Sequence, residues 1–206
     1  MSDPIVRTAT RADVPGAGAT LAAAFHDDPV LAHLLPDAAR RPARATRFFR
    51  TMAGIQLGLG HVYVCPGADG GPPDGAAIWA PPGEWKLPTS TVVRTLPQLT
   101  RVFGTMTLRS LGVLTTMEKL HPPDPPHWYL EFLGTAPNRR GQGVATAVLA
   151  PVLERADAEG VPAYLENSNE ANLGLYGRLG FEVTGTFTVA KGGPTMWSMW
   201  REPRCG

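Results

Sequence analysis

The chain has 206 residues, of which 43% are hydrophobic, and its 19 basic and 18 acidic residues leave a formal net charge of +1. This length supports one hydrophobic core, so we expect a single globular domain over residues 1–206. Because the charges are spread along the chain and form no basic stripe, neither nucleic acid nor an anionic membrane is expected as a partner.

The N-terminus and the cysteines favour a cytoplasmic protein. Met1 to Arg7 contains an early acidic residue and no apolar run, so neither a secretory signal nor a membrane-spanning helix is expected. Cys65 and Cys205 lie far apart, without a CxxC spacing or a nearby histidine. They are therefore expected to be plain thiols, and no metal site is predicted.

In chain order, the first half predicts a strand, a helix, a longer helix and two strands. These elements cover residues 5–8, 10–25, about 40–57, 61–65 and 75–79. Thr10 followed by Asp13 has the form of a capping box at the start of the first helix.

Residues 81–126 are the least regular part of the sequence. Helical patches cover 88–120, and a stiff proline-rich connector follows over 122–126. Several apolar side chains here look exposed: Trp85, Phe103, Met106 and Met117.

The second half alternates strands and helices and ends on a hairpin. The predicted strands cover 127–134, 162–166, 181–189 and 195–200, and the predicted helices cover 144–160 and 169–179. This order predicts an α/β fold with a mixed sheet.

A glycine-rich loop between a strand and a long helix predicts a phosphate site. Glycines leave the backbone open to an anion, and the helix N-terminus supplies unpaired amides and positive potential. The sequence lacks the Gly-Lys-Ser/Thr of a P-loop, whereas Arg140, Gly143 and Ala145 match the order of a coenzyme A loop. A dinucleotide fingerprint is weakened, because Thr146 replaces its third glycine, but this alternative stays open.

A second motif follows in the predicted helix over 169–179. Asn172 and Tyr176 are four residues apart and share one helix face, Gly180 suits a left-handed C-cap, and Phe181 opens the next strand.

The two motifs together resemble the GNAT superfamily of N-acetyltransferases over roughly residues 128–202. The stretches His127–Leu130 and Tyr164–Glu166 are most similar to the puromycin N-acetyltransferase-like bacterial enzymes. The resemblance implies a mixed, largely antiparallel central sheet flanked by helices and splayed between the fourth and fifth strands. It also implies a variable segment over 81–126 on the acceptor side and an acetyl-CoA-binding core over 127–202.

The resemblance also implies where acetyl-CoA binds. Backbone groups of three strand residues would pair with pantetheine, the loop would hold the pyrophosphate, and two helix residues would contact the thioester region. The residues concerned are Leu133, Gly134, Thr135, Arg140, Gly141, Gln142, Gly143, Val144, Ala145, Asn172 and Tyr176. Gly134 departs from the family, which usually has a larger residue there; this predicts an altered bulge or extra space beside the acetyl group.

Three residues are the candidates for catalysis. Tyr176 can stay protonated at neutral pH and act as general acid to the leaving thiolate. Glu131 and Glu166 are the candidate general bases, with His121 and His127 in reserve. No nucleophile triad is apparent, so direct attack by the amine in a ternary complex is preferred.

The expected acceptor is the amine of a small molecule. Acetylation of a protein lysine or N-terminal amine and a non-catalytic acyl-CoA-binding module are the alternatives. The chain is expected to act as a monomer or a homodimer.

Overall fold

A computed structural model describes residues 4–67 and 70–204, so Cys205 lies outside the described residues. The strands are β1 (Arg7–Thr8), β2 (Val62–Cys65), β3 (Gly75–Ala80), β4 (Trp128–Thr135), β5 (Ala163–Asn167), β6 (Glu182–Thr188) and β7 (Thr195–Arg201). The helices are α1 (Val14–Ala24), α2 (Pro29–Leu34), α3 (Arg41–Gln56), α4 (Thr89–Phe103), α5 (Thr107–Leu120), α6 (Val144–Glu159) and α7 (Leu173–Arg178).

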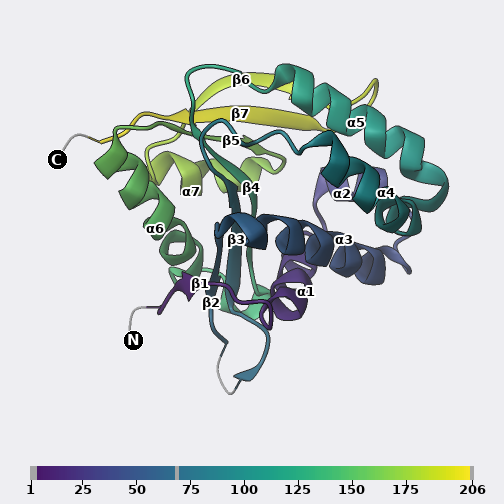
Figure 1. The fold of residues 1–206 in the computed structure, drawn as a ribbon, viewed down its shortest axis with the longest axis horizontal. Coiled ribbons are helices and arrows are strands. Elements are labelled where there is room, and N and C mark those ends of the chain that lie inside the picture. The colour runs from purple at the N-terminus through teal and green to yellow at the C-terminus, as the bar shows by residue number, and fades with distance from the viewer. Residues whose placement is uncertain (1–3, 68–69, 205–206) are drawn as a thin grey trace.

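The seven strands form one sheet in the order β1-β2-β3-β4-β5-β7-β6. Every neighbouring pair is antiparallel except β4 and β5, which run parallel. Figure 1 shows β5, β6 and β7 turning away from β2, β3 and β4. The expected mixed, largely antiparallel sheet, splayed between its fourth and fifth strands, is therefore confirmed.

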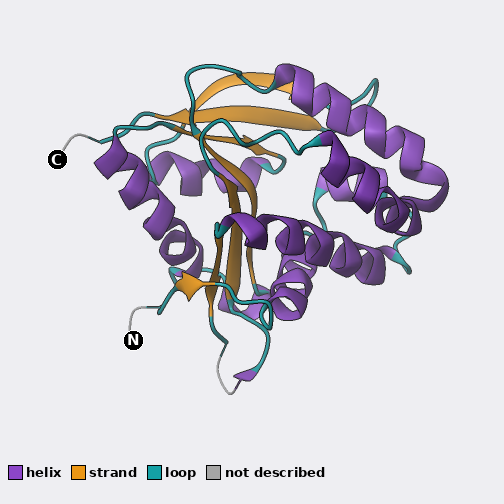
Figure 2. Ribbon diagram, in the orientation of Figure 1, coloured by secondary structure: helices purple, strands orange, loops and turns teal. Residues whose placement is uncertain are grey.

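Helices cover both faces of this sheet and bury a separate apolar cluster on each (Figure 2). Side chains of α1, α3, α4 and α5 pack on one face, which we call the acceptor face. Side chains of α6 and α7 pack on the other, which we call the coenzyme face. Because neighbouring strand residues point to opposite faces, β2, β3, β4 and β7 contribute to both clusters.

Three parts of the fold differ from the sequence prediction. The irregular region is two regular helices, α4 and α5, and Phe103, expected to look exposed, is only 3% exposed. The short helix α2, capped by Asp28, was not predicted. The predicted helix over 169–179 is divided into a 3₁₀ turn, 170–172, and α7.

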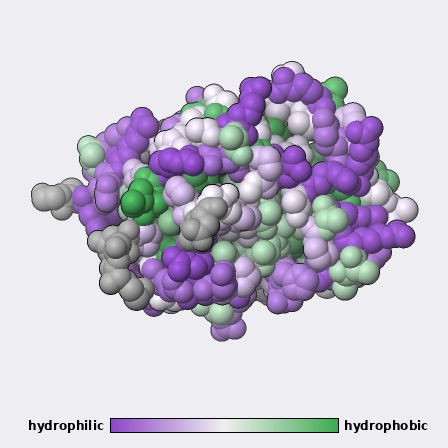
Figure 3. Space-filling model, turned by 90° about the horizontal axis from the view of Figure 1, so that it is seen from below, coloured by the Kyte–Doolittle hydropathy of each residue, from purple (hydrophilic) through white to green (hydrophobic). Residues whose placement is uncertain are grey.

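Hydrophilic residues surround a paler, weakly hydrophobic middle on the face of the molecule seen in Figure 3. Among residues 4–67 and 70–204, no helix is both long and apolar enough to cross a membrane. Cys65 is a buried free thiol, and burial raises its pKa.

Gly134 lets α1 lie close against β4. A Cβ atom at this position would lie 2.8 Å from the Cβ of Ala24 and 3.0 Å from Cδ2 of Leu21. The missing side chain therefore makes room for α1, whose side chains fill the space that a larger residue would occupy. The bulge lies earlier in the strand, at Glu131.

We expect Gly134→Ala to lower the free energy of unfolding by about 1–3 kcal/mol, because the backbone of α1 must shift to accept a methyl group. Gly112→Ala is the matched control: a Cβ at Gly112, inside α5, meets no atom within 4 Å. That change should raise stability by up to about 1 kcal/mol. Urea unfolding of both variants measures the difference, and equal effects would contradict the close packing.

Candidate active site

The glycine-rich loop presents an open backbone at the start of α6. Gly141 and Gly143 have φ angles of +73° and +79°, the left-handed region that side-chain-bearing residues rarely adopt. A Cβ at either position would meet no atom within 4 Å, so the space above both is open. Gly143 is the N-cap of α6, and the amides of Val144 and Ala145 follow in its first turn. These groups fit a pyrophosphate.

Arginine side chains hold this loop against the rest of the protein. Arg139 Nε donates to the Asp74 carboxylate at 2.9 Å, which ties the loop to β3. Arg140 Nη2 donates to the Ala24 carbonyl of α1 at 3.2 Å, but its side chain stays exposed. A cleft of about 440 Å³ opens beside Arg140, between α1 and Pro137. The loop thus has both fixed geometry and a free positive charge nearby.

The strands β4 and β5 pair over only three positions. Trp128, Tyr129 and Leu130 lie opposite residues 163–165, and beyond Leu130 the two strands part. Residues 132–135 of β4 continue to pair with β3, and the end of β5 continues to pair with β7. The β4 edge at Leu133, Gly134 and Thr135 therefore faces the gap, where a linear ligand could add its hydrogen bonds.

Glu131 occupies the bulge at the start of this gap. The β3 register passes from Ile78–Phe132 to Trp79–Leu130, which leaves Glu131 as the extra residue. Its carboxylate accepts a hydrogen bond from Gln56 Nε2 of α3, and its second oxygen has no partner among the described residues. Burial is the largest cause that raises the pKa of Glu131 to about 8, the charge of Glu166 adds to it, and the Gln56 bond opposes it.

Glu166 lies on the same face, in a pocket of aromatic rings. Its side chain is 2% exposed, and its Oε1 lies 3.5 Å from Nδ1 of His121. Tyr129 and Tyr164 present their rings edge-on to His121. Both phenols have pKa values raised by burial and, next, by the charge of Glu166, so they stay protonated.

Tyr176 lies on the opposite face of the sheet. It packs in the apolar cluster of α6 and α7, 6.0 Å from the ring of Phe181, and is 7% exposed. Burial raises its pKa, and no described residue hydrogen-bonds to its hydroxyl. Asn172, one turn earlier, is exposed at the N-cap of α7. The structure therefore puts Tyr176 on the coenzyme face and the two glutamates on the acceptor face.

Comparison with known proteins agrees with this geometry. The sequence model of the Acetyltransferase (GNAT) family matches residues 86–181. A crystal structure described as histone acetyltransferase HPA2 and related acetyltransferase, from Corynebacterium glutamicum, is 28% identical; the match covers 100% of this chain and 99% of that one, with a TM-score of 0.75. The family match spans 96 of the 206 residues, and the chain has the fold of the GNAT acetyltransferases.

Two further N-acetyltransferases resemble the protein less closely. An uncharacterised N-acetyltransferase of Schizosaccharomyces pombe is 27% identical over 82% of this chain and 70% of its own length. The structure of arylalkylamine N-acetyltransferase 2 from Aedes aegypti has a TM-score of 0.71 at 12% identity and covers 98% of this chain and 100% of its own. The second likeness concerns the fold alone. The family generally uses acetyl-CoA, which the open loop fits.

Sequence reasoning underrated two residues of the site. His121 was only a reserve candidate, because prolines follow it and nothing in its spacing links it to Glu166. Gln56, which bonds Glu131, was not singled out; it sits at the end of a helix, and its only signal is a polar residue on the buried face of α3. No group of three or more potential metal ligands occurs among the described residues.

We expect Gly143→Glu to weaken acetyl-CoA binding at least about tenfold, or about 1.4 kcal/mol, because it strains the turn and puts a carboxylate where phosphate should lie. Gly60→Glu is the matched control, since Gly60 has a φ of +78° and equally open surroundings at the far end of β2. Calorimetric titration with acetyl-CoA measures both variants. Unchanged affinity in Gly143→Glu would show that the loop is misassigned, and NADH titration tests the dinucleotide alternative.

The raised pKa of Glu131 predicts that the protein loses stability as the pH rises. The Glu131 carboxyl binds its proton more tightly in the folded protein than in the unfolded chain. The protonated group therefore stabilises the folded state fully below its usual pKa of 4.5, and this stabilisation is lost as the pH rises toward 8. The free energy of unfolding should therefore fall less between pH 5 and pH 9 in Glu131→Gln than in the wild type. Urea unfolding at both pH values tests this, and equal slopes would contradict it.

Proposed function

We propose that the protein transfers an acetyl group from acetyl-CoA to the amine of a small molecule, by direct attack in a ternary complex. The observation that supports this most is the division of proton-transfer groups across the gap between β4 and β5. A candidate acid, Tyr176, lies on the coenzyme face, and two candidate bases lie on the acceptor face. Amine acylation needs one group of each kind, on opposite sides of the reacting carbonyl.

On the coenzyme face, the protein must supply a proton to the leaving thiolate. Tyr176 holds its proton because burial raises its pKa, and its hydroxyl is not engaged by a described residue. It can therefore donate at neutral pH. Asn172 lies one turn away and is assigned to contact the coenzyme near the thioester.

Along the gap, the backbone of β4 must bind and polarise the acyl group. Amides between Leu133 and Thr135 can donate to the oxygen that becomes negative during transfer. In other enzymes, removing one such donor reduces the stabilisation of the transition state by about 3 kcal/mol. The loop from Arg140 to Ala145 then holds the pyrophosphate at the start of α6, which orients the whole coenzyme.

On the acceptor face, the protein must remove a proton from the incoming ammonium. Glu131 and Glu166 are both buried there, and each has at least one oxygen without a hydrogen-bond partner among the described residues. For Glu131, protonation removes the cost of a buried charge, so this carboxylate accepts a proton readily. Either residue can act directly or through a water molecule.

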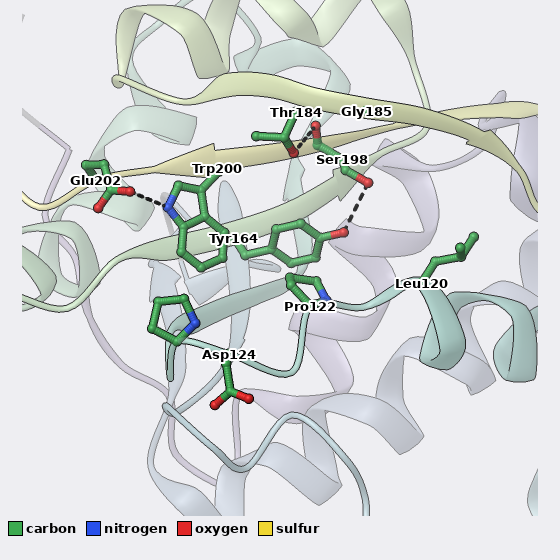
Figure 4. Close-up of a pocket in the computed structure, with 10 residues that line it drawn as sticks. Leu120, Pro122, Asp124, Tyr164, Thr184, Gly185, Ser198, Trp200 and Glu202 are labelled. Atoms are coloured by element: carbon green, nitrogen blue, oxygen red, sulfur yellow. Dashed lines mark hydrogen bonds between the residues drawn. The ribbon is translucent and has the colours of Figure 1, made fainter.

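The acceptor is assigned to a cleft of about 410 Å³ on this face. Figure 4 shows Tyr164 and Trp200 beside Pro122 in this cleft, with Ser198 hydrogen-bonded to the Tyr164 hydroxyl at 3.2 Å. Ser198 is the register partner of Glu166, although Glu166 itself does not line the cleft. The lining suits a small amine with an apolar or aromatic body, and segment 81–126, assigned to the acceptor side, contributes its proline-rich end.

Protein acetylation is the second candidate, because the Corynebacterium glutamicum structure is described as a histone acetyltransferase and related acetyltransferase. A non-catalytic acyl-CoA-binding role is disfavoured by Tyr176 and the two glutamates. Coenzyme A release should be measured with a panel of small amines, puromycin included, and with lysine peptides. Turnover with small amines alone supports the proposal, and turnover with peptides alone overturns it. A cytoplasmic location and a monomeric or homodimeric state remain predictions.

We expect Tyr176→Phe to lower kcat by about 10²-fold, because the thiolate must then leave without its general acid. The KM for acetyl-CoA should change little. Tyr63→Phe is the matched control, since Tyr63 packs against the same apolar cluster. Steady-state kinetics across the pH range test both variants, and a Tyr176→Phe enzyme with the wild-type rate and pH profile would rule out the acid role.

A further inference from the structure

Two histidines and a glutamate form a buried chain of polar atoms on the acceptor face. His127 Nδ1 lies 2.8 Å from the Pro125 carbonyl oxygen, and His127 Nε2 lies 2.9 Å from His121 Nε2. The other ring nitrogen of His121 lies 3.5 Å from Glu166 Oε1. His127 is 1% exposed and His121 is 5% exposed, so water is largely excluded from both rings.

The positions of the protons in this chain follow from its first member. A carbonyl oxygen only accepts, so His127 Nδ1 must carry a hydrogen. Burial lowers the pKa of His127, which makes the ring neutral and leaves its Nε2 as an acceptor. His121 must then donate from Nε2, and its Nδ1 is the atom turned toward Glu166.

One exchangeable proton therefore belongs to His121 and Glu166 together. Neither oxygen of Glu166 accepts a hydrogen bond of good geometry from a described residue, although the phenols of Tyr129 and Tyr164 lie near enough for its charge to raise their pKa values. The side chains of His121 and Glu166 are each 2% exposed. An unpaired buried carboxylate is costly, whereas a proton on His121 Nδ1 or on Glu166 removes that cost. The pair can thus exist in two states, with or without this proton.

The groups around the pair confine the proton to it. Trp85 stacks on His121 with ring centroids 3.9 Å apart, and Tyr129 and Tyr164 stand edge-on to the same ring. Both phenols stay protonated because burial raises their pKa values. The remaining titratable neighbours are His127, which is neutral, and Glu131, which is hydrogen-bonded to Gln56.

We propose that His121 and Glu166 act as one proton-accepting pair for the acceptor amine, and that His127 fixes its geometry. This rests on the proposed function. When the ammonium is deprotonated, its N–H bond breaks, an O–H bond forms on Glu166, and the electron pair stays on nitrogen. The His121–Glu166 pair passes from one net negative charge to none. Glu166 is the catalytic residue, and His121 and His127 are positioning residues.

Kinetics of His121→Gln test the role of the pair. We expect kcat to fall on the order of 10²-fold, with an unchanged KM for acetyl-CoA. The acid limb of the kcat/KM profile should move, because coupled sites titrate as a pair and not as one residue. His61, whose ring lies edge-on to that of Trp128, supplies the matched control. His61→Gln should keep the wild-type profile. A lower rate with the wild-type profile would mean that His121 is only structural and would overturn the proposal.

A second measurement needs neither turnover nor a folded His121 variant. Correlation spectra of the imidazole nitrogens in the ¹⁵N-labelled protein should show His127 neutral with its proton on Nδ1, and His121 protonated on Nε2 throughout. Glu166→Gln should shift the titration of His121 but not that of His61. If His127 carries its proton on Nε2, or if Glu166→Gln leaves His121 unchanged, the proposal is wrong. If the spectra agree but no amine is acetylated, the proton-sharing pair stands and the proposed function fails.

Discussion

The parting of β4 and β5 after Leu130 is the constraint on which the rest of the site depends. A parallel pair that stayed joined would satisfy the backbone groups of both strands and leave no room for a ligand. The bulge at Glu131 bends β4 at the point of separation and keeps β4 joined to β3. The gap is therefore held open from one side, and it connects the two faces of the sheet.

The two faces of the sheet differ in the ionisable groups that are buried on them. On the coenzyme face, Tyr176 is buried among apolar side chains and keeps its proton. On the acceptor face, Glu131 and Glu166 are buried with Gln56 and His121 beside them. For Glu131, burial raises the pKa, and the hydrogen bond from Gln56 only partly opposes this. The same physical effect thus raises the pKa of a phenol on one face and of a carboxyl group on the other.

The segment between β3 and β4 completes the acceptor face. Helices α4 and α5 pack their apolar sides against α3, and the proline-rich connector then carries His121 and His127 to the start of β4. Trp85, near the beginning of this segment, stacks on His121, which lies near the end of the segment. The part of the sequence with the least regular pattern therefore supplies the packing around Glu166.

The sequence by itself determined the coenzyme side of the protein. Left-handed glycines, a helix N-terminus and the spacing of Asn172 and Tyr176 are local properties, decided by residues a few positions apart, so pattern could predict them. Only the tertiary structure decided that Gly134 serves the packing of α1, that Gln56 bonds Glu131, and that His121 faces Glu166. These contacts join residues distant in sequence, and strand register and helix packing fix them, because burial and its effect on charge exist only once the chain has folded.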